Sequence, residues 1–245
     1  MLKILFYFLF IPGFLYTAII GLIATWIDRK VTARIQWRVG PPWYQPFADV
    51  LKLLGKETFV PEGASKIIFL SAPLLGLSAA TLVATMLWLL NINPYSSFIG
   101  DLIVIIYLLT IPSLSLIIGG SASRNPLSAI GTSREMKLIL AYELPFILAI
   151  FTVVAKAGSI LIGKIIAYQA IHGMLIGSYS GAITFIVSLL VVQAKLGFVP
   201  FDIAEAEQEI MGGTLLEYSG APLAVFKLTK AMLLFTLPML LITLY

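Results

Sequence analysis

Runs of about 20 mostly apolar residues alternate with shorter polar stretches along the chain. A run of that length can cross the hydrocarbon core of a bilayer as a helix. The pattern therefore predicts an all-α fold, a polytopic transmembrane helix bundle of about six spans that forms a single membrane domain over residues 1–245. The expected spans are residues 4–27, 67–90, 102–118, 136–155, 181–196 and 221–244.

Two shorter stretches predict helices that lie at the membrane surface. Residues 47–57 carry apolar side chains at the spacing of one helical face but are too few to span. An amphipathic interfacial helix fits them. A second short interfacial helix is expected within residues 156–180, which are half polar. The other polar stretches, residues 28–66, 119–135 and 197–220, are expected to be loops.

Composition supports the membrane class and excludes several kinds of chemistry. The chain is 60% hydrophobic and 11% charged, whereas a soluble domain is about 25% charged. The chain has no cysteine, so it cannot hold an iron–sulfur cluster through thiolates or form a disulfide. The single histidine, His172, has no second ligand nearby, and no nucleotide loop, catalytic triad or metal-ligand spacing is present. We therefore expect no catalytic, cofactor-binding or metal residues in this chain, and a non-catalytic role within a larger assembly.

Lysine and arginine are unevenly shared between the two ends of the expected spans. Eleven lie in the loops after the first, third and fifth spans, and three (Lys3, Lys156 and Lys164) lie on the other side. Because positive loops stay in the cytoplasm, these loops are expected to be cytoplasmic and both termini outside.

The loop at residues 197–220 holds five of the 12 acidic residues: Asp202, Glu205, Glu207, Glu209 and Glu217. If residues 202–209 form a helix, three of these carboxylates share one face, and their repulsion favours proton uptake by at least one of them. Pro200 suits the first turn of such a helix. The alternative, which the pattern alone favours, is a solvated acidic stripe that docks a basic partner.

Charged residues within the spans form a second group of candidates. Glu143 lies inside the fourth expected span, where a charge is costly and usually functional, and Pro145 loosens the helix beside it. Lys227 and Lys230 are three residues apart and share a face of the last span. They could pair with carboxylates or reach back to the cytoplasmic interface. Glu143 could likewise be a carboxyl near the interface.

The basic run after the first span includes Arg29, Lys30, Arg34 and Arg38. Its placement on the positive side of the membrane explains most of it. Arg29 and Arg34 are also close enough to the end of the span to pair with the acidic loop.

Three motifs resemble a known family. Asp28-Arg29-Lys30-Val31, Ala33-Arg34-Ile35-Gln36-Trp37-Arg38-Val39-Gly40-Pro41 and Gln45-Pro46-Phe47-Ala48-Asp49-Val50-Leu51-Lys52-Leu53 resemble the start of the H-type membrane subunit of respiratory complex I. Pro200-Phe201-Asp202, Glu205-Ala206-Glu207 and Glu217-Tyr218-Ser219-Gly220 resemble its acidic loop, and Tyr142-Glu143 its intramembrane glutamate. The motifs follow the order of the family over residues 1–230.

The resemblance implies a subunit that joins a cytoplasmic redox arm to a membrane arm that pumps ions. By this resemblance the polar path between the arms includes Glu143, Asp202, Glu205, Glu207 and Glu217, with Arg29 as a nearby cation. With Glu209, Lys227 and Lys230, which the spacing of charges adds, the expected ion- or proton-coupling residues are Glu143, Asp202, Glu205, Glu207, Glu209, Glu217, Lys227 and Lys230. The residues expected to dock or support the redox arm are Arg29, Arg34, Gln36, Arg38 and Asp49.

The chain also departs from the quinone-reducing members. Where they have Glu-Thr-Asn-Arg before Pro-Phe-Asp, this chain has Lys195-Leu196-Gly197-Phe198, and its loop between Pro41 and Gln45 is shorter. Both changes resemble the group 4 membrane-bound nickel–iron hydrogenases and their sulfur-reducing relatives, which use ferredoxin. The family also has about two further helices after the last span, so either these are lost beyond Tyr245 or another chain supplies them.

The expected partners follow from this resemblance. They are cytoplasmic subunits that carry iron–sulfur clusters and a nickel–iron centre, antiporter-like membrane subunits and the lipid bilayer, with no nucleic acid. The alternatives are a quinone-site subunit of an NADH- or coenzyme-F420-dependent dehydrogenase, a stand-alone secondary transporter and a purely structural anchor.

Overall fold

The computed structural model describes the backbone of residues 2–245 and the side chains of residues 5–245, and this described part is helical with no strand. The side chain of Lys3, counted above for orientation, lies outside it. The α-helices are α1 (Leu2–Leu9), α2 (Phe14–Ile35), α3 (Gln45–Leu54), α4 (Lys66–Ile92), α5 (Asp101–Leu108), α6 (Ile111–Ala122), α7 (Pro126–Ala157), α8 (Ile162–His172), α9 (Tyr179–Lys195), α10 (Glu207–Ile210) and α11 (Gly220–Leu244). Short 3₁₀ turns are η1 (Pro94–Ser96), η2 (Leu175–Gly177) and η3 (Gly213–Leu215).

The predicted polytopic helix bundle is confirmed. Within the described residues, five helical runs are long and apolar enough to cross a membrane: Leu5–Ile35, Lys66–Ile92, Asp101–Ala122, Pro126–Ala157 and Gly220–Leu244. The helix α9 is apolar but shorter, at 17 residues. The short helices α3 and α8 lie where the sequence pattern places interfacial helices.

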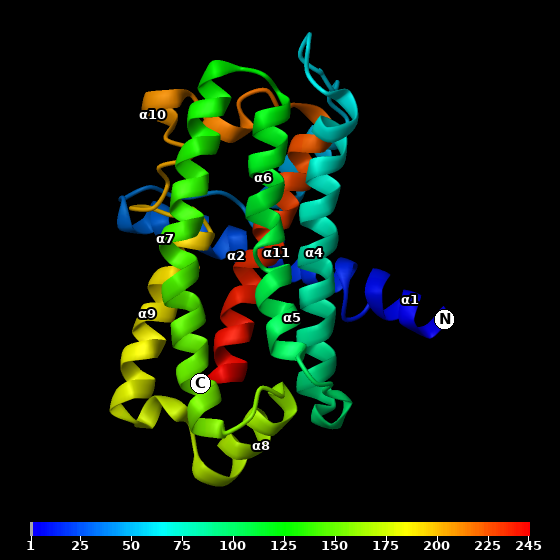
Figure 1. Cartoon of the computed structure of the whole chain (residues 1–245). Coiled ribbons are helices and arrows are strands. Elements are labelled where there is room, and N and C mark those ends of the chain that lie inside the picture. Colours follow the sequence, from blue (N-terminus) through cyan, green and yellow to red (C-terminus); the bar gives the residue numbers. More distant parts are fainter. Residues whose placement is uncertain (1) are drawn as a thin grey trace.

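The helix α11 lies at the centre of the bundle. It packs against α2 and α4 and also contacts α9, while α7 packs against α9 and α6 (Figure 1). Its side chains Met232, Leu237 and Leu240 are fully buried. Leu237 and Leu240 belong to one apolar core that α4, α5, α7 and α9 complete. Since α11 is surrounded on most sides, its charged residues near the beginning face protein as well as lipid.

Small residues let the helices approach closely, as is common in membranes. A Cβ atom at Gly21 of α2 would lie 2.4 Å from the carbonyl oxygen of Ala231, so α2 crosses α11 at backbone contact. At Gly131 of α7 a Cβ would lie 2.7 Å from the backbone nitrogen of Thr214. The acidic loop therefore rests directly on α7.

The first expected span is interrupted at Pro12. The chain forms two helices there, and α1 projects from the side of the bundle while α2 crosses behind it (Figure 1). Proline has no backbone N–H to continue the helical ladder. The third expected span is divided in the same way into α5 and α6, with Pro112 at the start of the second helix.

The expected loop at residues 119–135 is wrong. The helix α6 continues to Ala122 and α7 already begins at Pro126. Asn125 caps α7, since its Oδ1 accepts a hydrogen bond from the backbone nitrogen of Leu127 at 2.8 Å. The polar side chains that suggested a loop form hydrogen bonds inside the fold. Ser128 donates to the backbone carbonyl of Gly120 at 3.0 Å, and Thr132 donates to that of Ser128 at 2.7 Å.

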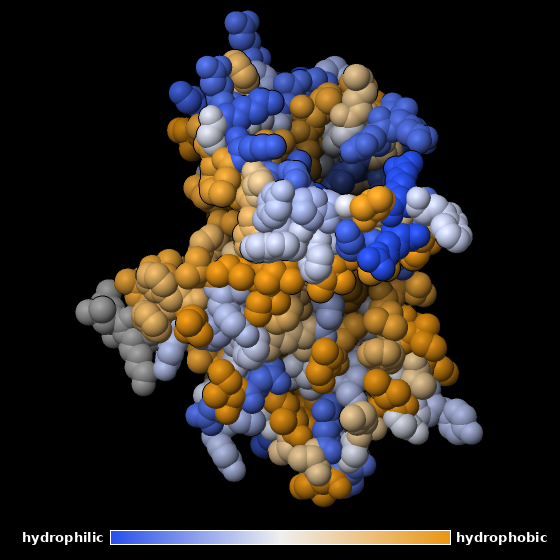
Figure 2. All heavy atoms as spheres, turned by 180° about the vertical axis from the view of Figure 1, so that it is seen from behind, coloured by the Kyte–Doolittle hydropathy of each residue, from blue (hydrophilic) through white to orange (hydrophobic). Residues whose placement is uncertain are grey.

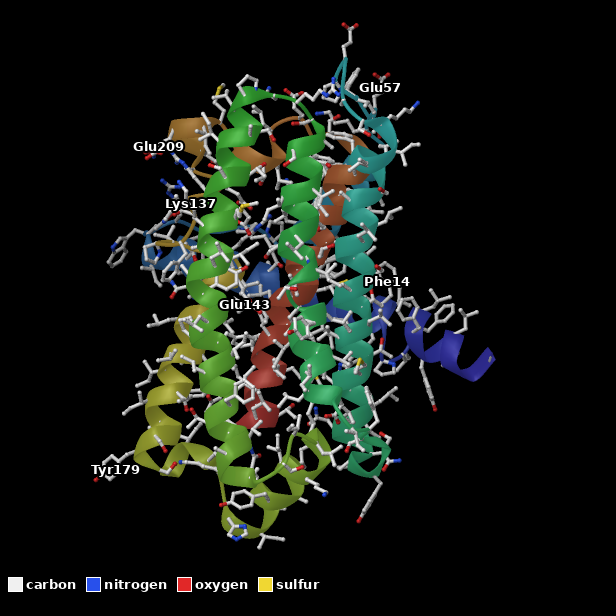
Figure 3. The ribbon with its side chains drawn as sticks, in the orientation of Figure 1. Phe14, Glu57, Lys137, Glu143, Tyr179 and Glu209 are labelled. Carbon is white, nitrogen blue, oxygen red and sulfur yellow. The ribbon has the colours of Figure 1, made fainter. Side chains whose placement is uncertain are left out.

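The polar loops gather at one end of the molecule. Glu57 and Glu209 lie near that end, Tyr179 lies at the other, and Glu143 lies between them (Figure 3). Hydrophilic atoms concentrate over the same loop-bearing end, while hydrophobic atoms dominate the body below it (Figure 2). This arrangement is that of a membrane protein with one polar face built from several loops.

Candidate functional site

The segment at residues 197–220 is mostly irregular, as expected of a loop, and the helix considered for residues 202–209 does not form. Only Glu207–Ile210 is α-helical, and a left-handed Met211 ends it. Like charges on one helical face repel one another. Here the carboxylates instead diverge to different partners, which an unbroken helix would prevent.

Three carboxylates of the loop have partners in three different helices or connections. Glu205 accepts hydrogen bonds from Lys230 of α11 at 3.1 and 3.2 Å. Glu209 pairs with Arg134 of α7 at 2.6 Å. Glu217 accepts a hydrogen bond from the side chain of Asn125. The loop is thus tied across the end of the bundle at several points.

The other two predicted carboxylates, Asp202 and Glu207, have exposed side chains. Both line an open hollow of about 580 Å³ on the outside of the loop, together with Arg134 and Glu209. Asp202 also lines a narrow cavity on the inner side.

This inner cavity, about 70 Å³ in volume, lies between the loop and the helices α6, α7, α9 and α11. Its charged lining residues are Glu135, Lys195, Asp202, Glu205, Lys227 and Lys230. Such a volume holds a few water molecules at most. Acidic and basic groups therefore share a small space at the edge of the apolar core.

A second cavity of about 260 Å³, the outer cavity, lies between the loop and the helices α2, α3 and α11. Its charged residues include Asp28, Arg29 and Asp49. Glu205, Lys227 and Lys230 line both cavities. These three residues form the charged part of the wall between the cavities.

Glu143, near the middle of α7 (Figure 3), forms an ion pair with Lys195 at 2.9 Å. The Lys195 side chain is only 3% exposed and that of Glu143 18%. The ammonium group also lies 5.0 Å from the ring centroid of Tyr142 and 4.9 Å from that of Phe146. Burying both charges carries a desolvation cost, so the pair is weak evidence for added stability.

Sequence reasoning missed two groups of this site. The motifs indicate Lys195 only as a departure from a family pattern, and the polar pattern places Glu135 in a loop. Glu135 is 9% exposed, lines the inner cavity and lies within electrostatic reach of Glu205 and Lys230. Asn125 followed by Pro126 is a typical N-cap and first residue of a helix, and that signal would have placed Glu135 inside a helix.

The expected pairing of Arg29 with the acidic loop is not present. Arg29 instead pairs with Asp49 at 2.8 Å, and Gln45 donates to the same carboxylate at 2.9 Å. Burial acts to raise the pKa of Asp49, but hydrogen bonds from Arg29 and Gln45 and the charges of Arg29 and Lys227 lower it below its usual range. This pair ties α3 to α2 beside the outer cavity.

The remaining residues predicted to support docking, Arg34, Gln36 and Arg38, are exposed at the end of α2 and just beyond it. The side chain of Trp37 beside them is 97% exposed. They lie apart from both cavities. Within the described part of the chain, no group of three or more His, Cys, Asp or Glu side chains is placed to hold a metal ion.

Comparison with known proteins gives consistent matches. A family model described as NADH dehydrogenase matches residues 7–245. The H-type subunit of the NADH-quinone oxidoreductase of Thermomicrobium roseum is 36% identical over 179 residues, which covers 65% of this chain and 52% of that protein. The corresponding protein of Desulfotalea psychrophila is 32% identical over 162 residues, covering 63% and 48%. The matches thus span about half the length of these relatives.

A solved structure is similar over nearly the whole chain. It is described as the membrane-bound sulfane sulfur reductase, an archaeal respiratory membrane complex. One of its chains is 32% identical, with a TM-score of 0.89 over 99% of this chain and 79% of that chain. Because the family model and the solved fold both extend over almost all of its residues, this chain belongs to the NADH dehydrogenase family, together with the H-type subunits of NADH-quinone oxidoreductases.

Proposed function

We propose that this chain is the membrane subunit of an ion-translocating redox complex related to respiratory complex I, and that it couples the redox arm to movement of protons or sodium ions. One observation carries the proposal. Two cavities share Glu205, Lys227 and Lys230, and the inner one reaches Lys195, the partner of Glu143. Charged groups thus form a series from the outer cavity beside α3 to the middle of α7.

The proposed mechanism is electrostatic. Electron transfer or protonation at a redox site above the acidic loop changes the charge near Asp202 and Glu205. Groups in a confined, water-poor space interact strongly, so their proton occupancies respond together. The response passes through the shared wall and Lys195 to Glu143, and from there to antiporter-like partners in the membrane.

We place the complex in the hydrogenase or sulfane-reductase branch rather than the quinone-reducing one. Phe198 occupies the position of the arginine in the quinone-reducing motif and lines the outer cavity. Its ring centroid lies 5.9 Å from the ammonium group of Lys230. An apolar ring replaces a hydrogen-bond donor there, and the likeness to the sulfane sulfur reductase supports the same assignment.

The partners in this proposal are a cytoplasmic iron–sulfur subunit, a large hydrogenase-like subunit and antiporter-like membrane subunits. The iron–sulfur clusters and a nickel–iron centre belong to the partners. The loop-bearing end, with its excess of lysine and arginine, faces the cytoplasm, and Arg34, Gln36 and Arg38 contribute to docking the redox arm.

The test uses the intact complex in liposomes with the variants Glu143→Gln and Asp202→Asn. We expect redox turnover to continue while redox-driven ion uptake falls about tenfold, equivalent to about 1.4 kcal/mol. Glu62→Gln is the matched control, because Glu62 is an exposed acid at the same end. Wild-type ion uptake in both variants would refute the relay.

A second measurement separates the proposal from a secondary transporter. The purified chain alone, in liposomes, is expected to move no ions or substrate. Transport by the chain without redox partners would instead support a carrier whose substrate the acidic loop gates.

A further inference from the structure

Lys195 is a buried cation at the junction between the ion pair and the inner cavity. Its side chain is 3% exposed, and it is the last residue of α9. We propose that Lys195 is an internal counter-ion that holds Glu143 ionised and transmits any change in its charge to the carboxylates of the inner cavity. This inference rests on the proposed function and assigns a positioning role to a residue outside the expected coupling set.

The immediate surroundings of Lys195 require a charged partner. The rings of Tyr142 and Phe146 lie beside the ammonium group, with centroids 5.0 and 4.9 Å away. Cation–π contacts support the charge but do not replace an anion. Glu143, at 2.9 Å, supplies it. Removing either member leaves an uncompensated buried charge, which is strongly unfavourable.

Lys195 also connects Glu143 with the inner cavity. Lys195 is part of the cavity lining and Glu143 is not. The groups that face this region come from every element packed around it: Ser113 of α6, Glu135 and Tyr142 of α7, Asp202 and Glu205 of the acidic loop, and Lys227 and Lys230 of α11. Lys195 therefore stands between one carboxylate in the bundle and several at its edge.

This placement gives the pair two charge arrangements. When Glu143 is ionised, its negative charge balances the positive charge of Lys195. When Glu143 takes up a proton, the ammonium group loses its partner, and its flexible four-carbon stem allows it to turn toward Glu135 and Glu205 in the cavity. Protonation at Glu143 is then felt in the cavity as added positive charge. By reciprocity, a charge change in the cavity alters proton binding at Glu143.

The first test is a cycle of variants in the purified complex. Glu143→Gln leaves the buried charge of Lys195 unpaired, and Lys195→Met forces Glu143 to take up a proton at neutral pH, so each is expected to lower the thermal midpoint of the complex. The double variant Lys195→Met/Glu143→Gln removes both charges and is expected to be more stable than either single variant. Strictly additive losses would overturn the inference. Lys164→Met, at an exposed lysine, is the control and should leave the midpoint unchanged.

The second test is a spectroscopic signature that a merely structural role would not move. Infrared spectra at neutral pH should show a new protonated carboxyl band in Lys195→Met, absent from Lys195→Arg and from the double variant. A spectrum of Lys195→Met without this band, or a band that persists in the double variant, contradicts the inference. Both readouts are independent of ion transport, so they hold or fail separately from the proposed function.

Discussion

At the residue scale, the ion pairs of this chain differ in how far they are buried. Arg29 and Asp49 are each about one third to one half exposed, and pairs of that kind contribute little to stability. The Lys195–Glu143 pair is buried, and the cost of desolvating both charges offsets its attraction, so it too is weak evidence for added stability. The sequence identified Glu143 because an acid within an apolar run is conspicuous. Its partner was not identifiable, because Lys195 lies 52 positions away and only the packing of α7 against α9 brings it close.

Asp49 gives a prediction about pH. Its lowered pKa means that the contact with Arg29 contributes stability above the ordinary aspartate pKa of about 3.9, and that this contribution is lost as the pH falls through the lower folded value. Carbon-13 NMR of aspartate carboxyls in nanodiscs, assigned with Asp49→Asn, should show a midpoint below the ordinary one. In Arg29→Met the midpoint should rise. An unchanged midpoint in that variant would exclude Arg29 as the cause.

At the element scale, apolar runs are sufficient to locate the spanning helices but not their ends. The polar residues between Ala122 and Met136 suggested a loop, because nothing in a pattern shows that Ser128 and Thr132 bond to backbone carbonyls. The expected spans 4–27 and 102–118 run through Pro12 and Pro112, where the structure breaks each into two helices, and the pattern did not indicate that α1 leaves the bundle. The acidic segment is a loop, as expected, and its carboxylates do not share one helical face because they pair with cations from α7 and α11.

The contact of α7 with the acidic loop predicts the effect of Gly131→Ala. Alanine favours a helix over glycine by about 1 kcal/mol. The added Cβ, however, would lie 2.7 to 2.8 Å from backbone atoms of Gly213 and Thr214, which cannot rotate away. Overpacking of this kind costs about 1–3 kcal/mol, so we expect net destabilisation and a displaced loop.

The measurement is the thermal midpoint of the complex, together with protease sensitivity of residues 205–214. Gly177→Ala is the matched control, because nothing lies within 4 Å of a Cβ at that position. If Gly131→Ala equals or exceeds the wild type in both assays, the close contact between loop and helix is incorrect.

At the scale of the whole molecule, the polar end meets the apolar body where Glu205, Lys227 and Lys230 separate the two cavities. The outer cavity opens beside α2 and α3, the inner cavity borders α7 and α9, and Glu205 with Lys230 lies between them. Composition and motifs were enough to predict a membrane bundle and its family. The inner cavity was not predictable, because it arises from residues of α6, α7, α9, the acidic loop and α11, which meet only in the folded chain.

The ratio of ions translocated to electrons transferred, measured in liposomes with the intact complex carrying Glu205→Gln, tests the central claim most directly. This variant removes a negative charge common to both cavities and leaves Lys230 unpaired, while Glu143 and Lys195 remain intact. The account predicts sustained electron transfer with an ion-to-electron ratio reduced about tenfold, and a normal ratio in Glu62→Gln. A wild-type ratio in Glu205→Gln would contradict it.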